Sequence, residues 1–265
     1  ADDMTMREKA DEVVAGLKVM AWILRPERCV IGIEDNKPDA IAAMRKATEG
    51  TQTEIAVIPT KYPSGGEKQL VQILTGMEVP SGGIPADIGV ICQNIGTAVA
   101  VAQAVLDGTP LISRVVTITG EAVREPGNFE ALIGTPIKYL LEQAGVQQDR
   151  LSRLVLGGPM MGYTLTTDAV PVIKTTNCVI AAAASELPAP LPEQPCIRCG
   201  QCAEACPMEL LPQQLFWYAK ATEFDKAEHL NLFDCIECGA CSYVCPSSIP
   251  LVQYYRFAKG EIRMQ

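Results

Sequence analysis

The sequence predicts three domains: an α/β domain, then a small α+β domain, then an α-helical domain. Three observations lead to this division. Strand patterns alternate with helical patterns in the first part of the chain. A strand pair, one helix and a returning strand follow in the second part. Eight of the eleven cysteines lie in two short runs near the C-terminus. We place these domains at residues 1–110, 111–170 and 196–265, with a linker at 171–195.

The first domain is predicted to alternate helices and strands. Apolar residues recur at helical spacing over residues 4–25, and Pro26 ends that helix. Asp35 or Asn36 can cap the next helix, which has Pro38 in its first turn. This alternation predicts a mostly parallel sheet. The expected strands are residues 28–33, 53–58 and 88–93, and the last helix spans 97–107.

The second domain is predicted from a change of pattern after Ser113. Residues 114–123 alternate like a strand pair, and the sequence Pro-Gly-Asn that follows favours a turn. A short helix over residues 136–143 ends at Gly145, and residues 151–162 add a strand and a glycine turn. This order of elements suggests a β-grasp fold. The proline-rich sequence ELPAPLPEQP that precedes the third domain predicts a semi-rigid linker.

Two cysteine runs dominate the third domain. Each follows the pattern C-x2-C-x2-C-x3-C-P, as CIRCGQCAEACP from Cys196 and as CIECGACSYVCP from Cys235. Bacterial two-cluster ferredoxins use this spacing, and in them the fourth cysteine of each run binds the other cluster. We therefore predict two [4Fe–4S] clusters. The expected ligands are Cys196, Cys199, Cys202 and Cys245 for the first cluster, and Cys235, Cys238, Cys241 and Cys206 for the second.

Other uses of these cysteines fit less well. A zinc ribbon needs two C-x-x-C pairs and four ligands in all, whereas further cysteines crowd each pair here. A disulfide framework is typical of small secreted chains, and this chain of 265 residues is not small.

The repeat continues beyond the cysteines. At a constant offset of 39 residues, QLFWYAK at Gln214–Lys220 aligns with QYYRFAK at Gln253–Lys259. An aromatic helix is therefore expected after each cluster loop. We expect these aromatic residues to shield the clusters from water rather than to conduct electrons, because a cluster's surroundings control its solvent access and potential.

Composition argues against several classes of function. The net charge is −9 and no run of Lys or Arg exceeds two residues, which argues against a nucleic-acid partner. Apolar stretches are too short for a membrane span, so we expect a partner to provide any membrane attachment. Cluster-forming cysteines indicate a reducing compartment, namely the cytoplasm or its membrane face. No Ser/His/Asp set or paired carboxylate site is recognised, which argues against a hydrolase.

Two glycine-rich loops each lead into a predicted helix, YPSGGEK at Tyr62–Lys68 and QNIGT at Gln93–Thr97. Free N–H groups at a helix N-terminus can bind an anion such as phosphate. Neither loop matches a dinucleotide or P-loop signature, so ordinary turn chemistry stays an alternative. A third glycine sequence, Ser81–Gly83, is expected to be only a turn.

The remaining cysteines and the single histidine are expected to have structural roles. Cys29 and Cys92 lie in predicted strands and are expected in the core. Cys178 has no partner at ligand spacing, and His229 lies in a polar helix that we expect at the surface.

Several segments in combination resemble one protein family. They are EDNKPDAI from Glu34, PTKYPSGGEKQL from Pro59, QNIGTAVAV from Gln93, the segment around VVTITGEAV, and PEQPCIRCGQCAEACP. From end to end, the chain resembles the C subunit of the Rnf/Rsx ion-translocating electron transport complex. The resemblance implies an α/β domain of the flavin-binding type, shared with the flavoprotein subunit of respiratory complex I. It also implies that the β-grasp domain is of the SLBB type and that the last domain is ferredoxin-like.

The resemblance also implies a function. The family is a peripheral subunit at the cytoplasmic face of the inner membrane, within a redox-driven translocase that links ferredoxin and NAD(H). Its partners include integral membrane subunits. The two [4Fe–4S] clusters would relay electrons to or from a flavin and NAD(H) site, with FMN and NAD(H) bound by the full-length protein. Both glycine-rich loops match regions that line FMN, which makes candidates of Gly65, Gly66, Glu67, Lys68, Asn94 and Thr97.

The sequence departs from the family in one respect. A glycine-rich GGAGFP-type loop for FMN and NADH and an N-terminal sandwich domain are not found in it. The chain begins Ala-Asp-Asp, so we expect a piece of a longer protein that holds only part of the flavin-binding domain. An alternative function is a soluble cobalamin reductase of similar domain order. A module with purely structural clusters is a third, although two intact cysteine runs exceed what such a role needs.

Overall fold

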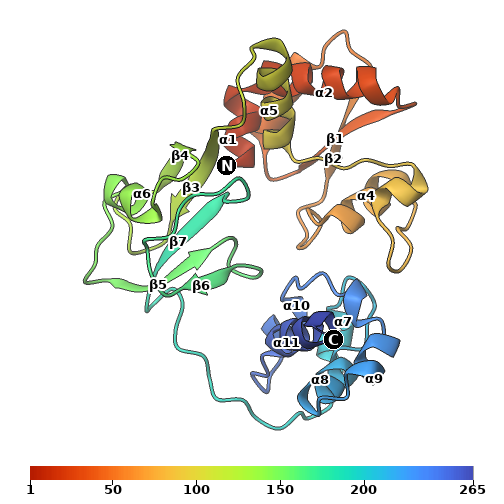
Figure 1. Cartoon of the computed structure of the whole chain (residues 1–265), viewed down its shortest axis with the longest axis vertical. Helices are drawn as coiled ribbons and strands as arrows, with labels where there is room; N and C mark the ends of the chain where they lie inside the picture. The colour runs from red at the N-terminus through yellow and green to blue at the C-terminus, as the bar shows by residue number, and fades with distance from the viewer. Residues whose placement is uncertain (265) are drawn as a thin grey trace. The chain divides into compact units, whose positions relative to one another are not determined.

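The computed structural model describes residues 1–264 of the chain. Contacts between Cα atoms divide it into two compact units, which we describe separately (Figure 1). The first unit comprises residues 1–78, 85–158 and 163–187. The second comprises residues 188–264 together with two short segments, 79–84 and 159–162.

The first part of unit 1 is an α/β layer with a two-stranded parallel sheet. Strand β1 (Cys29–Glu34) pairs in register with β2 (Thr53–Ile58), and α3 (Pro38–Ala47) connects them. The sheet packs with α1 (Asp2–Glu8), α2 (Ala10–Leu24) and α5 (Ile95–Leu106). Buried Val13, Ile33, Met44 and Val99 form the centre of this core. The predicted parallel pairing is therefore confirmed.

Two predicted elements of this layer were wrong. The single helix expected over residues 4–25 is two helices, α1 and α2, separated at Lys9, whose backbone leaves the helical region (φ −123°, ψ 31°). The strand expected at 88–93 does not form. A 3₁₀ turn, η1 (Pro85–Ile88), comes first, and Gly89 then turns with φ +74°. Ile91 is 54% exposed, so its apolar run does not enter the core.

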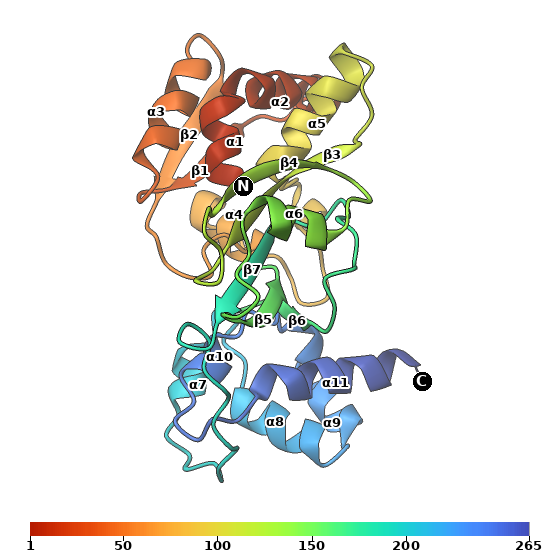
Figure 2. The same cartoon turned by 90° about the vertical axis from the view of Figure 1, so that its left-hand side faces the viewer.

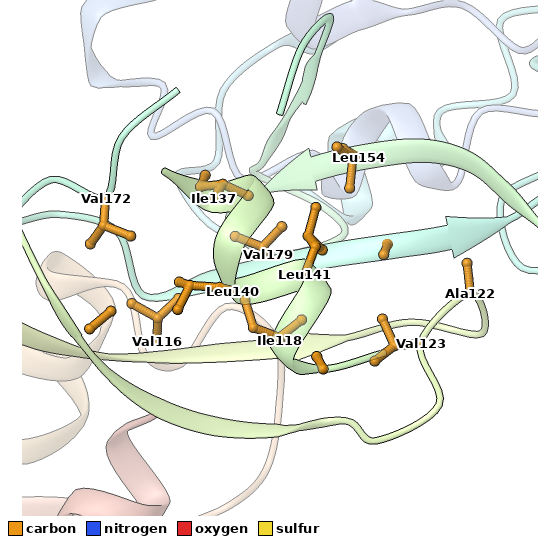
Figure 3. Packing of buried hydrophobic residues seen from close by; sticks show 13 residues of the cluster. Val116, Ile118, Ala122, Val123, Ile137, Leu140, Leu141, Leu154, Val172 and Val179 are labelled. Carbon is orange, nitrogen blue, oxygen red and sulfur yellow. The ribbon is translucent and has the colours of Figure 1, made fainter. Parts of the chain in front are cut away.

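The second part of unit 1 is a five-stranded sheet covered by one helix (Figures 1 and 2). The strand order is β4-β3-β7-β5-β6. Side chains from the helix and the sheet gather in one apolar cluster that includes Ile118, Leu141 and Val179 (Figure 3). The elements are β3 (Ser113–Thr119), β4 (Gly127–Leu132), α6 (Ile137–Gln143), β5 (Leu151–Leu156), β6 (Tyr163–Leu165) and β7 (Cys178–Ala183).

The segment expected to be a linker from residue 171 contains the central strand of this sheet. Strand β7 pairs parallel with β3 and antiparallel with β5, and its Val179–Ala183 run is buried. The expected strand pair also differs, because its second strand is β4 rather than a part of residues 114–123. Gly120 takes φ +115° at the end of β3, with Ala181 O only 2.2 Å from where a Cβ would lie. A tight backbone approach therefore ends β3 early.

Within the residues that the structure describes, the regular elements of unit 2 are helices, which are joined by irregular loops. Helices α8 and α11 pack against each other around buried Leu215, Leu251 and Tyr255. None of the helices within residues 1–264 is long and apolar enough to cross a membrane. The helices of the unit are α7 (Gln201–Glu204), α8 (Pro212–Lys220), α9 (Phe224–His229), α10 (Ala240–Tyr243) and α11 (Leu251–Met264), with a 3₁₀ turn at Leu232–Asp234.

Candidate metal centres

The two cysteine runs fold into loops of the same backbone shape. Gly200 and Gly239 hold the same place in each run and have φ +82° and +84°. Arg198 and Glu237, which also correspond, have φ +57° and +56°. Non-glycine residues are uncommon in this left-handed region, so its occurrence in both loops points to a shared geometric demand.

Each loop directs a backbone N–H at its own first cysteine. Arg198 N donates to Cys196 Sγ at 3.4 Å, and Glu237 N donates to Cys235 Sγ at 3.4 Å. Hydrogen bonds to cluster sulfurs favour the reduced, more negative state and are one means by which a protein sets cluster potential. The loops can therefore hold thiolates and also stabilise their charge.

The second centre is a cavity lined by four cysteines. Three come from the second run and the fourth, Cys206, comes from the first. Burial, together with the charges of Cys235, Cys238 and Cys206, raises the pKa of the Cys241 thiol to about 12. The rest of the lining is apolar or backbone and includes Pro207, Leu215, Gly239, Val252 and Tyr255.

Cysteines of both runs also lie near one another at the first centre. Burial raises the pKa of the Cys202 thiol, and the nearby charges of Cys199 and Cys245 raise it further. Cys245 belongs to the second run, and its nearness to Cys202 of the first run is what the predicted ligand exchange requires. Cys196, Cys202 and Cys245 also pack against the apolar core of the unit, while Cys199 is exposed.

Within residues 1–264, no group of three or more His, Cys, Asp or Glu side chains is arranged to hold a single metal ion. A [4Fe–4S] cluster makes a different demand, because it is a four-iron body held by four thiolates. Four cysteines around one apolar cavity fit that donor set, and the second centre has this form.

The aromatic helices form the apolar surroundings of both centres, as predicted. Tyr255 of α11 is buried, and its hydroxyl donates to Pro212 O at 2.7 Å. Burial and the neighbouring Cys241 raise the pKa of this phenol, which keeps it neutral. Phe216 of α8 meets Tyr254 of α11 edge to face, with ring centroids 4.9 Å apart.

The two glycine-rich loops come together in unit 1. Gly66 precedes the first residue of α4 (Glu67–Thr75), and Asn94 caps α5 by accepting a hydrogen bond from Gly96 N at 2.8 Å. Burial raises the pKa of Cys92, and the charge of Glu67 raises it further, so Glu67 lies near the segment that leads to Asn94. Gly65, Glu67 and Asn94 are exposed, and Lys68 and Thr97 are half-buried.

Among the other predicted residues, Cys29 lies half-buried in β1. Cys92 lies in an irregular segment rather than a strand, and Cys178 begins β7. His229 ends α9 on the surface, as expected. The turn at Ser81–Gly83 has a further contact, because Ser81 Oγ and Gly82 N donate to the carboxylate of Asp234, immediately before Cys235.

Comparison with known proteins matches these three regions to three families in the same order. A Nuo51 FMN-binding domain covers residues 1–103, an SLBB domain covers 115–164, and a 4Fe-4S dicluster domain covers 195–249. These matches confirm the predicted fold classes, and FMN and [4Fe–4S] as the cofactor classes.

Curated relatives extend over the whole chain. The C subunit of the ion-translocating oxidoreductase complex of Pseudomonas aeruginosa is 57% identical over 265 residues, which is 100% of this chain and 34% of the relative. The same subunit of Erwinia tasmaniensis is 59% identical over 99% of this chain and 33% of its own length. The chain belongs to the family of C subunits of ion-translocating oxidoreductase complexes. It spans about a third of the length of these curated relatives.

Solved structures give the same fold. An NAD+-reducing [NiFe]-hydrogenase in the H2-reduced state superposes with a TM-score of 0.61 at 17% identity. The alignment covers 100% of this chain and 52% of the hydrogenase chain. At this identity the similarity shows a shared fold.

Sequence reasoning missed a charged group beside the second centre of this family member. Lys259 is buried, and its ammonium donates to Cys235 O at 2.6 Å and to Glu237 at 3.0 Å. Arg256 also pairs with Glu237, at 2.9 Å. One signal was visible, because aligned positions 198 and 237 carry opposite charges in the two runs.

Proposed function

We propose that this chain is an electron-transfer part of the C subunit in a membrane-bound, ion-translocating ferredoxin:NAD oxidoreductase. Two [4Fe–4S] clusters relay single electrons to or from a flavin and NAD(H) site. The first cluster is held by Cys196, Cys199, Cys202 and Cys245, and the second by Cys235, Cys238, Cys241 and Cys206.

One observation carries this proposal. Cys206 of the first run lines a cavity together with Cys235, Cys238 and Cys241 of the second, and Cys245 of the second run lies near Cys202 of the first, which supports an exchange of the fourth ligand. Exchange of the last ligand ties the two clusters into one body. Neighbouring clusters in a shared apolar shell suit electron relay, because the shell limits solvent access and so controls potential.

The flavin side is proposed from the two loops that meet in unit 1. FMN carries a phosphate, and the N-terminus of a helix such as α4 suits an anion, while at α5 the N–H groups of Gly96 and Thr97 donate to Asn94. The loop before α4 also follows β2, at the carboxyl end of a parallel strand, where ligands of α/β folds bind. The proposed lining is Gly65, Gly66, Glu67, Lys68, Asn94 and Thr97.

We place the protein at the cytoplasmic face of the membrane as a peripheral subunit. Its proposed partners are the other subunits of the complex, including integral membrane ones, and ferredoxin and NAD(H) as redox partners. The names of its relatives support a multi-subunit complex, and the cysteines require a reducing compartment.

The ligand exchange is tested by two matched substitutions in the full-length protein, Cys245→Ser and Cys206→Ser. Cys245→Ser should remove or convert the cluster held by Cys196, Cys199 and Cys202 and spare its neighbour. Cys206→Ser should do the reverse. Iron content and EPR spectra of the reduced, anaerobically purified proteins report which cluster is lost. Loss of the cluster in the same run as the substituted cysteine would overturn the assignment.

The role in the complex is tested with the purified assembly. In the intact complex, NADH or reduced ferredoxin should reduce both clusters, and either cysteine variant should stop electron transfer between the two while the complex still assembles. If transfer continues at the wild-type rate without either cluster, the relay function is wrong. Reduction of cob(II)alamin by the isolated protein would favour a cobalamin reductase instead.

A further inference from the structure

A buried lysine lies beside the second cluster loop. Lys259 of α11 is 5% exposed. Its ammonium donates to the backbone carbonyl of Cys235 at 2.6 Å and to Glu237 Oε1 at 3.0 Å. A buried cation needs a partner, and this one has both a carboxylate and a carbonyl. The ammonium is thus held within the same loop as the first three cysteines of the second set.

The first half of the repeat lacks this arrangement. Lys220 occupies the equivalent place in α8, but its side chain is 52% exposed and pairs with Glu193 at 2.7 Å. Arg198 replaces Glu237, and its guanidinium lies 5.5 Å from the ring centre of Trp217. Solvent screens charges of this exposed kind far more than buried ones. The two centres therefore share backbone geometry but differ in fixed charge.

The three side chains of this ion-pair group sum to one excess positive charge, while Asp234, immediately before Cys235, adds a carboxylate that accepts from Ser81 and Gly82. Lys259 and Arg256 are positive and Glu237, which accepts from both, is negative. Glu237 Oε2 accepts from Arg256 Nε at 2.9 Å and Glu237 Oε1 accepts from Lys259 Nζ at 3.0 Å, so each carboxylate oxygen faces a cation.

Such fixed charges act on a redox centre in opposite directions according to sign. Reduction adds one electron to the cluster and makes the cluster with its thiolates more negative. A nearby cation stabilises that state and raises the reduction potential, while a nearby anion lowers it. Burial strengthens both effects because the local dielectric is low.

We propose that Lys259 and Glu237 tune the reduction potential of the second cluster selectively, with the buried ammonium raising it and the carboxylate lowering it. The inference rests on the proposed function, since it requires both clusters to be present. Because of Lys259 and Glu237, the two clusters have different reduction potentials, although their loops have the same shape.

The test is an EPR-monitored redox titration of the anaerobically purified full-length protein. Lys259→Met should shift the potential of the second cluster downward, and Glu237→Gln should shift it upward. Lys259→Arg, which keeps the positive charge, should leave the reduction potential of the second cluster close to the wild-type value. Lys220→Met is the matched control at the equivalent position and should leave both potentials unchanged. The Cys245→Ser background, which retains the second cluster alone, identifies the signal that moves.

The potential shifts expected for Lys259→Met and Glu237→Gln have opposite signs, and this distinguishes an electrostatic effect from damage to the loop. A general loosening of the site would move Lys259→Met and Glu237→Gln in the same direction, and that result overturns the inference. Unchanged potentials in both variants, with both clusters present, would also overturn it and leave the relay function intact. Absence of clusters from the wild-type protein would instead reject the proposed function itself.

Discussion

At the scale of single residues, the two cluster loops have the same backbone geometry although the side chains at matching positions differ. Arg198 and Glu237 have opposite charges and the same left-handed conformation. Glu209 and Ser248, a second corresponding pair, both have φ +51°. Left-handed conformations cost an L-residue about 1 kcal/mol or more, and the costs recur at matching positions. The spacing of the cysteines, rather than the residues between them, therefore determines the loop shape.

Gly239 should be more sensitive to substitution than its repeat partner Gly200. Both have positive φ, so alanine costs about 1 kcal/mol at either position. A Cβ on Gly239 would also lie 2.7 Å from Met160 O, whereas a Cβ on Gly200 meets no chain atom within 4 Å. We expect Gly239→Ala to lower occupancy of the second cluster and Gly200→Ala to retain both. Iron content and EPR intensity of the two variants measure this, and equal losses would contradict the contact with Met160.

The neighbouring cysteines within each run could be recognised because their spacing is local in the sequence, whereas their grouping into two exchanged ligand sets stays a prediction. Lys259 could not, because its partner Cys235 is 24 residues away and the contact depends on how α11 packs. The internal repeat places Lys220 and Lys259 at equivalent positions, but a repeat does not reveal burial. Burial distinguishes the exposed lysine from the enclosed one.

At the scale of elements, glycines allow two backbone segments to approach closely at several places in this chain. Helices α2 and α5 are in contact where Gly16 faces Ala98, and a Cβ on Gly16 would lie 1.8 Å from Ala98 O. Glycine weakens a helix by about 1 kcal/mol relative to alanine, so its presence there reflects this contact. The helix pair in turn supports the start of α5, where Asn94 and Thr97 lie.

Gly16→Ala should therefore destabilise unit 1 despite the better helix propensity of alanine. We expect a loss of about 2 kcal/mol or more in the free energy of unfolding, because backbone must move. Gly260→Ala in α11 is the control, since a Cβ there meets open space, and it should be neutral or stabilise by up to about 1 kcal/mol. Denaturant unfolding followed by circular dichroism measures both. A stabilising Gly16→Ala would contradict the close approach of the helices.

Elements were predicted well where periodicity was strong and poorly where tertiary pairing decided. The helices α4 and α5 and the parallel pair β1 and β2 followed from pattern. Strand β7 was missed because CVIAAA, next to a proline-rich stretch, gives no alternation, and a strand buried on both sides needs none. The strand expected at 88–93 was wrong because an apolar run alone does not guarantee a partner strand.

At the scale of the whole chain, the order of parts is the property that the sequence predicted most completely. An FMN-binding type region, an SLBB region and a dicluster region follow one another, and relatives at 57% and 59% identity match over nearly the full chain. A shared fold does not establish a shared function. The hydrogenase that shares this fold is only 17% identical to this chain in sequence. The predicted exchange of cysteine ligands therefore carries the functional proposal.

Iron and acid-labile sulfide per chain, measured on anaerobically purified protein with EPR of the reduced state, test the central claim most directly. Two [4Fe–4S] clusters predict about eight irons and about eight sulfides per chain. The reduced protein should also show magnetic interaction between neighbouring centres. A colourless protein, a protein loaded with zinc, or one with about four irons and a single isolated signal would contradict two exchanged clusters.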